Sequence, residues 1–561
     1  MKKLSTNFVG QTAKSDIARL GNAETMNLFV ETSGSDYATN TILRSMPGYN
    51  AIYTNIANGY PRGVFKTSTN DIFHAHGNTL YCNGTAVKTI SNSNKQCSFV
   101  EVGGLEKRIL VCDGTAVYVA KLNTGVQGLS FKDIELPDNP RYGTSSSVLN
   151  QKIVPKRIVN FHDFIMVLAE DTDRIYYSCQ YPWEYDYEGK YDDYEQAIYN
   201  YDENDIFMLH WSSRTYSEFN SENYIGSKSI TGIAEATLED NDVFKATENG
   251  TYTYNGASIN ANKRDLIKYQ NGLFMKVDYE TAEIYPMGAW ITCDYNNDIT
   301  SDIAVCNGKL YATAMNSTQC FSYAGGDCVY GSPFSNTNEN SDIGSYSDCT
   351  GTIASNLVRY GSNGVYIGNA KISNDYVDRM LGTDVRLYSY KWYSHELAVF
   401  KGDSTALAYD ISSQSWITLT SNSNGTNIPI RYDFYGNYAQ TNNALCELTE
   451  SNWTEHDGNI VPRRRKGKII SLELGQEFQL DGLRFILNNG QCNGEATLTV
   501  TSNLSETDLR YVNLGEQGDY SNVVEFYDFG VAREFEVELS TSTASKFAIL
   551  GLEFDYKGAS Y

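Results

Sequence analysis

Hydrophobic and polar residues alternate along several segments near the end of the chain. Phe535, Val537 and Leu539 alternate with three glutamates, and apolar residues alternate again over residues 548–556. Successive side chains of a strand point to opposite faces of a sheet, so both segments predict strands with one apolar face. Glycines punctuate the turns between them. Residues 463–561 are therefore predicted to form a β-sandwich-like domain.

The dipeptide Asn-Gly recurs about ten times, for example at Asn83-Gly84 and Asn307-Gly308. Both residues tolerate positive φ, so the pair favours the tight turn of a β-hairpin. Strand-like residues follow most of these turns at intervals of roughly 40 to 75 residues, about one four-stranded sheet each. The pattern predicts an all-β chain with a β-propeller of six blades, or seven, over residues 51–450. A long array of β-sandwiches is the alternative.

The other segments are assigned around this propeller. Residues 1–50 are predicted to be an N-terminal arm with the strand that leads into the propeller, and residues 451–462 a linker. An insertion at about residues 181–224 is dense in carboxylates and tyrosines. Its Tyr185, Tyr187 and Tyr191 are candidates for contact with a neighbouring subunit, with a solvated loop as the alternative. The spacing of a calcium-binding loop is absent there.

The overall charge is strongly negative. The 561 residues include 44 Lys and Arg against 68 Asp and Glu, which gives a formal net charge of −24. Such a surface repels nucleic acid, so a dedicated DNA or RNA reader is not expected. The 11 cysteines are an odd number, and no apolar run is long enough to span a membrane. These features predict free thiols and folding in a reducing cytoplasm.

The sequence contains none of the usual motifs that bring catalytic side chains together. The sequence contains no Gly-x-Ser-x-Gly elbow, phosphate-binding glycine loop or His-Glu-x-x-His motif. His74 and His76 lie on one face of a predicted strand and could share a metal, but further ligands are not evident. Paired carboxylates leave glycosidase chemistry open on composition alone. We expect no catalytic residue, no metal and no cofactor, and so a protein that is not an enzyme.

One basic cluster stands out in this acidic chain. It comprises Arg463, Arg464, Arg465 and Lys466, and it directly follows Pro462. Opposite charges attract over several ångströms, so we expect the cluster to meet acidic surface on the propeller or on a neighbouring subunit. Contact with DNA and simple solvation are the alternatives.

Several short phrases carry a family resemblance. Leu514-Gly515-Glu516-Gln517-Gly518-Asp519-Tyr520 is followed nine residues later by Phe529-Gly530-Val531-Ala532-Arg533. Near the other end are Asn27-Leu28-Phe29-Val30-Glu31, Met46-Pro47-Gly48 and Arg62-Gly63, in that order. These phrases resemble those of the packaged-DNA stabilisation proteins of short-tailed bacteriophages, also called tail accessory factors or nozzle proteins. One departure is Asn503–Asp508, which stands where family members often carry Ser-Asp-Asp-Gly-Gly-x-Thr-Trp.

The resemblance implies a structural virion protein. The chain would form a ring, hexameric by tail symmetry, that retains packaged DNA and serves as the conduit for genome ejection. Its partners would be portal and adaptor proteins above, tail fibre or needle proteins below, and genomic DNA passing through without sequence-specific binding. It would be made in the host cytoplasm and located in the virion. The signature residues, expected to be structural, are Asn27, Leu28, Glu31, Pro47, Gly48, Arg62, Gly63, Leu514, Gly515, Gly518, Tyr520, Gly530, Ala532 and Arg533.

Two other functions remain open at this point. The first is a carbohydrate-binding or carbohydrate-hydrolysing propeller on a virion, as a fibre or depolymerase component. The second is a fibre or capsid decoration protein. Assembly symmetry and turnover of host glycans would separate them from a tail ring.

Overall fold

The computed structural model describes most of the chain, and the chain divides into two compact units. The described residues are 2–6, 8–10, 12–15, 21–32, 41–54, 56–57, 59–103, 107–122, 125–134, 136, 152–170, 174–178, 243–245, 249–262, 266–277, 290–293, 295, 298–324, 334–423, 425–472 and 476–558. The first unit comprises residues 1–96 and 343–561, and the second comprises residues 97–342. Within these described ranges the only α-helix is α2 (Asp375–Leu381), and none is long and apolar enough to cross a membrane.

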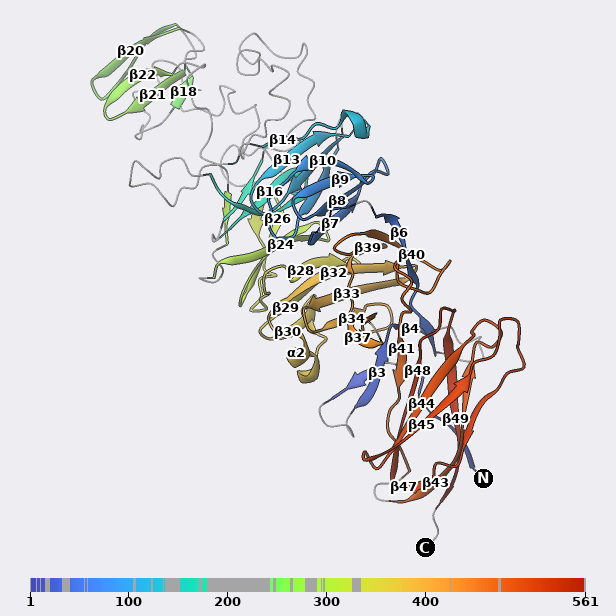
Figure 1. Ribbon diagram of the computed structural model, residues 1–561. Helices are drawn as coiled ribbons and strands as arrows, with labels where there is room; N and C mark the ends of the chain where they lie inside the picture. Colours follow the sequence, from blue (N-terminus) through green and yellow to red (C-terminus); the bar gives the residue numbers. More distant parts are fainter. Residues whose placement is uncertain are drawn as a thin grey trace. The chain divides into compact units, whose positions relative to one another are not determined.

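The first unit contains four groups of four antiparallel strands (Figure 1). Two of the groups are separate sheets, and the other two are joined by a parallel strand pair into one larger sheet. Three of the groups are meanders of strands that follow one another in the chain. The first is β7 (Pro61–Lys66), β8 (Ile72–His76), β9 (Thr79–Cys82) and β10 (Thr85–Thr89), and the second is β28 (Thr350–Ile353), β29 (Asn356–Gly361), β30 (Gly364–Ile367) and β31 (Ala370–Lys371). The third is β32 (Val385–Trp392), β33 (His395–Gly402), β34 (Ala406–Asp410) and β35 (Ser415–Thr418). The fourth joins β38 (Asp433–Gly436), β39 (Tyr438–Gln440) and β40 (Leu445–Thr449) to β6 (Gly48–Tyr53). A hairpin of β36 (Thr420–Ser423) and β37 (Thr426–Pro429) follows β35.

The second unit contains three further four-stranded antiparallel sheets and an insertion. The sheets are β11 (Ser98–Val102), β12 (Arg108–Cys112), β13 (Val117–Lys121) and β14 (Lys132–Asp133); β15 (Pro155–Phe161), β16 (Phe164–Ala169), β17 (Arg174–Tyr177) and β23 (Trp290–Thr292); β24 (Thr300–Cys306), β25 (Lys309–Ala314), β26 (Thr318–Tyr323) and β27 (Phe334–Asn336). A short 3-10 turn, η1 (Val126–Gly128), precedes β14. The insertion carries β18 (Val243–Lys245), β19 (Gly250–Tyr254), β20 (Ala257–Ala261), β21 (Leu266–Gln270) and β22 (Leu273–Val277).

Buried clusters join strands of consecutive groups within each unit. In the first unit, Val358 of β29 and Phe400 of β33 share one buried cluster. The next two groups are joined edge to edge, where β32 pairs with β38 in parallel, and Tyr390 and Phe434 of these strands share a second cluster. In the second unit, Val119 of β13 and Val167 of β16 lie in one common core. The chain is therefore an all-β propeller protein, as predicted. Each unit contains several groups of four antiparallel strands, the size of a propeller blade.

The turn chemistry explains why these hairpins form. Asn307 and Gly308, between β24 and β25, have φ of 49° and 71°. Asn83 and Gly84, between β9 and β10, have φ of 48° and 78°. Positive φ at both central residues matches the twist of the flanking strands, which confirms the role predicted for Asn-Gly.

The C-terminal domain is a β-sandwich built from both ends of the chain. One sheet contains β1 (Lys2–Thr6), β4 (Leu28–Thr32), β5 (Thr41–Ser45), β43 (Phe478–Leu487), β46 (Val524–Tyr527), β47 (Val531–Ala532) and β49 (Ala548–Gly558). The other contains β2 (Ala13–Lys14), β3 (Asn22–Met26), β41 (Arg463–Lys466), β42 (Ile470–Ser471), β44 (Glu495–Ser502), β45 (Glu506–Asn513) and β48 (Glu534–Thr541), and it continues through β3 to β35. Phe535, Val537 and Leu539 are buried in the core between the two sheets, as their alternation predicts.

Candidate functional site

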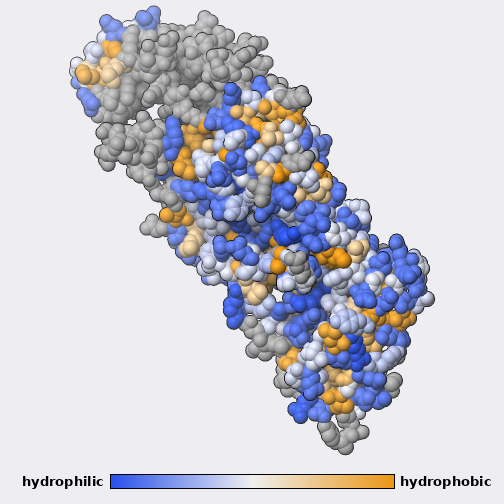
Figure 2. Space-filling view, viewed as in Figure 1, coloured by the Kyte–Doolittle hydropathy of each residue, from blue (hydrophilic) through white to orange (hydrophobic). Residues whose placement is uncertain are grey.

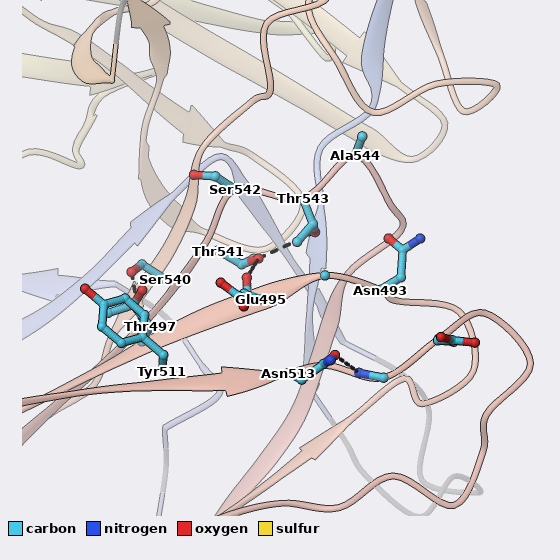
Figure 3. A pocket seen from close by; sticks show the side chains of 13 residues that line it. Asn493, Glu495, Thr497, Tyr511, Asn513, Ser540, Thr541, Ser542, Thr543 and Ala544 are labelled. Atoms are coloured by element: carbon cyan, nitrogen blue, oxygen red, sulfur yellow. Dashed lines mark hydrogen bonds between the residues drawn. The ribbon is translucent and has the colours of Figure 1, made fainter.

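A pocket lies on the outer face of the sandwich, where β44, β45 and β48 run side by side (Figure 3). Its volume is about 690 Å³, within the range of small-molecule sites. The residues that line it are Asn493, Gly494, Glu495, Thr497, Tyr511, Asn513, Gly515, Glu516, Ser540, Thr541, Ser542, Thr543 and Ala544.

Strand register brings these residues together from three segments. Tyr511 of β45 pairs with Thr497 of β44, and Thr497 pairs with Ser540 of β48. In the next row outward, Asn513 pairs with Glu495. The neighbours Ala496 and Leu498 point the other way and are buried in the sandwich core, so alternation leaves the polar side chains on the outer face.

Tyr511 provides an aromatic surface at one end of the pocket. Its side chain is 71% exposed, and in Figure 3 its ring lies beside Thr497 and Ser540. An exposed tyrosine presents an apolar ring face together with a hydroxyl group that can donate and accept hydrogen bonds. Leu509, two residues earlier on the same strand, is 52% exposed and extends the apolar surface beyond the pocket.

Polar groups form the other end of the pocket. The side chains of Asn493, Glu495 and Asn513 are exposed there. The Thr541 hydroxyl donates to the Glu495 carbonyl at 2.9 Å and fixes the backbone there, while the Gly515 amide donates to Asn513 Oδ1 at 2.8 Å and orients that side chain. The amide nitrogens of the two asparagines can donate hydrogen bonds, and the carboxylate can accept them. The pocket thus offers a ring face and a set of donors and acceptors to one ligand.

The loop after β48 forms the upper wall in Figure 3. It carries Ser542, Thr543 and Ala544, and the Arg463 guanidinium donates to the Thr543 carbonyl at 2.6 Å. Arg463 also donates to the Trp453 carbonyl at 3.2 Å. The buried Arg463 therefore joins this wall of the pocket to residues 451–462, the segment that precedes β41.

The basic cluster is an internal brace of the sandwich, which corrects the expectation that it meets acidic surface on the propeller or on a neighbouring subunit. Arg463 and Arg465 are buried, and Arg465 donates to the Phe8 carbonyl at 2.8 Å and to Thr25 Oγ1 at 2.6 Å. Burial lowers the pKa of both guanidinium groups. Arg464 pairs with Glu24 at 3.0 Å, and Lys466 pairs with Glu536. The acidic surface that the cluster meets belongs to β3 and β48 of the same chain, because alternation along β41 points two of its cations inward.

The N-terminal signature residues lie at junctions between segments that are distant in sequence. Asn27 is buried with φ of 51°, and its side chain donates to the Thr420 and Pro462 carbonyls and accepts from the Thr420 amide. Leu28 is buried in the sandwich core, and Glu31 forms an ion pair with Arg44 at 3.0 Å.

The turn and the Arg-Gly pair fill two further junctions. Pro47 and Gly48 are buried, and a Cβ on Gly48 would lie 2.7 Å from the Thr454 carbonyl oxygen. The buried Arg62 donates to the carbonyls of Gly77, Ser91 and Lys95, and the Gly63 amide donates to Gln440 at 3.3 Å. These four residues hold neighbouring backbone segments in place and do not line the pocket.

The C-terminal phrase borders the pocket directly. Leu514 is buried, Gly515 lines the pocket with φ of 94°, and the Gly518 amide donates to the Gly490 carbonyl at 2.9 Å. Tyr520 is exposed, and its ring occupies the space that a Cβ on Gly490 would need. From the sequence this phrase is expected to be structural only, and nothing there indicates that Gly515 and Glu516 line a pocket or that Tyr511 lies beside them.

The remaining signature residues support the opposite sheet. The Gly530 carbonyl accepts from the Leu480 amide at 3.0 Å, and Ala532 is buried in the sandwich core. Arg533 is exposed at the surface, 3.5 Å from Glu477. None of the three lines the pocket.

Other candidates from the sequence do not join this site. His74 and His76 are buried, with their Nδ1 atoms 3.2 Å apart, and His76 Nε2 lies 2.9 Å from the Thr441 carbonyl. Burial lowers their pKa to about 3 and about 4, so both are neutral at pH 7. No group of three or more potential metal ligands occurs in the described part of the chain. Tyr185, Tyr187 and Tyr191 lie outside the described residues.

No protein-family model matches the chain, and no curated protein matches it in sequence. It is similar to an exo-β-1,3-galactanase from Phanerochaete chrysosporium solved with β-1,3-galactotriose, at 9% identity and a TM-score of 0.22, over 99% of this chain and 100% of that chain. It is also similar to a glycoside hydrolase family 43 arabinoxylan arabinofuranohydrolase from Bacillus subtilis solved with cellotetraose, at 9% identity and a TM-score of 0.20, over 95% of this chain and 96% of that chain.

These comparisons correct one expectation from the sequence. Both matched structures are glycoside hydrolases, so the expectation that the chain is not an enzyme is withdrawn. At this level of identity the comparison assigns neither a substrate nor a catalytic residue to the chain.

Proposed function

We propose that the chain is a carbohydrate-binding β-propeller protein and that the pocket on its C-terminal sandwich holds the saccharide. One observation carries the proposal: the exposed Tyr511 ring stands beside exposed amide and carboxylate groups in an open pocket. The apolar C–H face of a sugar ring packs on an aromatic ring, while its hydroxyl groups need paired donors and acceptors at the edge. A place on a virion is supported by the family resemblance of the signature phrases.

Glycan binding by the full chain tests this proposal. We expect binding to at least one class of oligosaccharide on a glycan array, and a loss of at least tenfold in affinity, about 1.4 kcal/mol, in Tyr511→Ala by calorimetry. Tyr393 is the matched control, because it is also 71% exposed but lies between β32 and β33, away from the pocket. Tyr393→Ala should bind as the wild type does. Equal losses in both variants, or no binding at all, would contradict the proposal.

Hydrolysis is measured in the same samples. Released reducing ends show whether a bound oligosaccharide is also cleaved, and cleavage that survives Tyr511→Ala would place the reaction elsewhere in the chain. Several well-buried carboxylates of the propeller sheets are already engaged by cations: Asp302 lies 3.0 Å from Arg157, Asp410 lies 2.7 Å from His395, and Asp433 pairs with Lys401.

A component of a short phage tail is the second candidate function, favoured by where the signature residues lie. Asn27, Gly48 and Arg62 fix junctions between distant segments, so the resemblance involves the framework of the chain rather than one exposed loop. In this role the chain would form a hexameric ring below the portal and adaptor and would guide DNA out of the particle. Sedimentation and negative-stain images of the purified chain test it, since a strictly monomeric protein at all concentrations would contradict ring formation.

A further inference from the structure

The charges around the sandwich pocket point to selection among saccharides. We infer that the pocket binds amino-bearing saccharides best, neutral saccharides next, and carboxylated or sulfated saccharides worst. This inference rests on the proposed carbohydrate-binding function and adds the class of ligand to it.

Two carboxylates line the pocket, and no lysine or arginine does. Glu495 lies on β44 opposite Asn513, and Glu516 lies in the turn that follows β45. Both side chains are exposed, so they face the same solvent-filled space as the Tyr511 ring. A bound anionic sugar would lie close to two like charges with no lining cation to offset them, whereas an ammonium group would be attracted.

Two cations on the strands that form or border the pocket are committed to other partners. Arg464, which pairs across the strands with Ser540, lies 3.0 Å from Glu24 and 4.0 Å from Glu538. Arg510 is adjacent to Tyr511 on β45 and so points to the other face of the sheet. There it contacts Asp508 at 2.5 Å and packs over the Phe529 ring at 4.3 Å.

The carboxylates can also recognise neutral sugars. A carboxylate accepts hydrogen bonds from two adjacent hydroxyl groups, and the amides of Asn493 and Asn513 can donate to sugar oxygens. The pocket therefore has what a neutral ring needs, and its charge discriminates only against anions. Because the site is open, salt should weaken that discrimination.

Three oligosaccharides with one backbone test the inference: cellotetraose, the β-1,4-glucosamine tetramer and the β-1,4-glucuronic acid tetramer. An array of neutral, amino and carboxylated sugars with other linkages accompanies them. With the full chain we expect the amino form to bind more tightly than the neutral form, and the carboxylated form at least tenfold more weakly. Raising the salt from about 0.05 M to about 0.5 M should reduce these differences.

A double variant separates charge from shape. Glu495→Gln with Glu516→Gln keeps the shape and one acceptor oxygen of each side chain but removes both charges. Sugar hydroxyl groups can also accept from the new amide groups, so binding of the carboxylated sugar should improve about tenfold while binding of the neutral sugar changes less than threefold. Glu506→Gln is the control, because Glu506 is exposed at the far end of β45 and does not line the pocket.

The outcomes distinguish this inference from the proposed function. If carboxylated sugars bind as well as neutral ones, and Tyr511→Ala abolishes both, the charge selection is wrong and the saccharide site stands. If the double variant leaves the order of affinities unchanged, the two glutamates are not its cause, which also overturns the inference. If no sugar of any charge binds, the saccharide site itself is wrong.

Discussion

Single buried side chains join segments that lie hundreds of residues apart. Arg465 links β41 to Phe8 and Thr25, and Asn27 links the N-terminal strands to Thr420 and Pro462. Each of these side chains supplies donors to backbone or hydroxyl oxygens that have no access to water. Removal of such a donor leaves the buried acceptors unsatisfied, which costs more than the net gain of forming the bond.

The first prediction concerns Arg465. Arg465→Met should lower the free energy of unfolding by about 2–4 kcal/mol, because it leaves the Phe8 carbonyl and Thr25 hydroxyl without their charged donor. Arg533→Met is the control, since Arg533 is exposed and should change stability by less than about 0.5 kcal/mol. Urea unfolding of both variants checks this. A stable Arg465 variant that fails to oligomerise would instead restore the intersubunit contact predicted from the sequence.

The second prediction concerns His395, a buried histidine between two carboxylates. It lies 2.7 Å from Asp410 and 3.6 Å from Glu31, and Phe29 stacks on its ring. Burial alone would lower the pKa of His395, but its hydrogen bonds to Asp410 and Glu31 outweigh this and raise the pKa to about 9. The same contacts lower the pKa of both carboxyl groups.

Because its folded-state pKa is raised, His395 stabilises the fold fully below its unfolded pKa near 6.5 and loses this effect as the pH rises through about 9. The urea midpoint of the wild type should therefore fall between pH 6.5 and pH 9, by an amount that corresponds to no more than about 3 kcal/mol. His395→Gln should flatten this dependence, while His162→Gln, at an exposed position, should keep it. An unchanged slope in His395→Gln would show that other groups cause it.

At the scale of elements, strand type could be predicted and strand pairing could not. Alternation identified the core face of β48, and Asn-Gly pairs identified the hairpins, because both signals lie within a few residues. The pocket depends on β45 pairing with β44 and β44 with β48 in one register. Tyr511 and Ser540 are 29 positions apart in the sequence, and nothing local shows that Thr497 lies between them.

The third prediction tests the turn chemistry directly. Gly308 has φ of 71° and open space around the position of a Cβ, so Gly308→Ala should cost about 1–2 kcal/mol through backbone strain alone. Gly103 also has open space, but its φ does not lie in the left-handed region. Gly103→Ala should leave stability unchanged or raise it by up to about 1 kcal/mol. Thermal unfolding of both variants measures the difference, and equal effects would exclude strain as the cause.

At the scale of the whole molecule, the two ends of the chain meet in one framework. β6 completes a propeller sheet made by residues 433–449, and β1, β4 and β5 complete the sandwich made mainly by residues 478–558. The sequence predicted an N-terminal arm over residues 1–50 but could not show its partners, because such pairings span more than 390 positions. The visible face of the sandwich is mostly hydrophilic, with hydrophobic residues in small separate spots (Figure 2). Such spots are ordinary on a surface and do not by themselves mark a docking face.

The final prediction concerns the net charge of −24, which bears on both proposed functions. DNA binds proteins largely by releasing counterions from neutralised phosphates, and each phosphate contact needs a lysine or arginine. Four of the 44 cations of this chain, Arg463 to Lys466, form the only basic cluster, and its side chains are buried or paired with glutamates. The purified chain should therefore bind duplex DNA negligibly at about 0.15 M salt, where screening limits the reach of charge to about 8 Å. A conduit that must release DNA benefits from channel walls that carry few free cations, and a saccharide-binding protein does not need a basic surface either. Micromolar DNA binding that weakens steeply with salt, measured by fluorescence anisotropy, would contradict the acidic conduit and require a basic surface elsewhere in the chain.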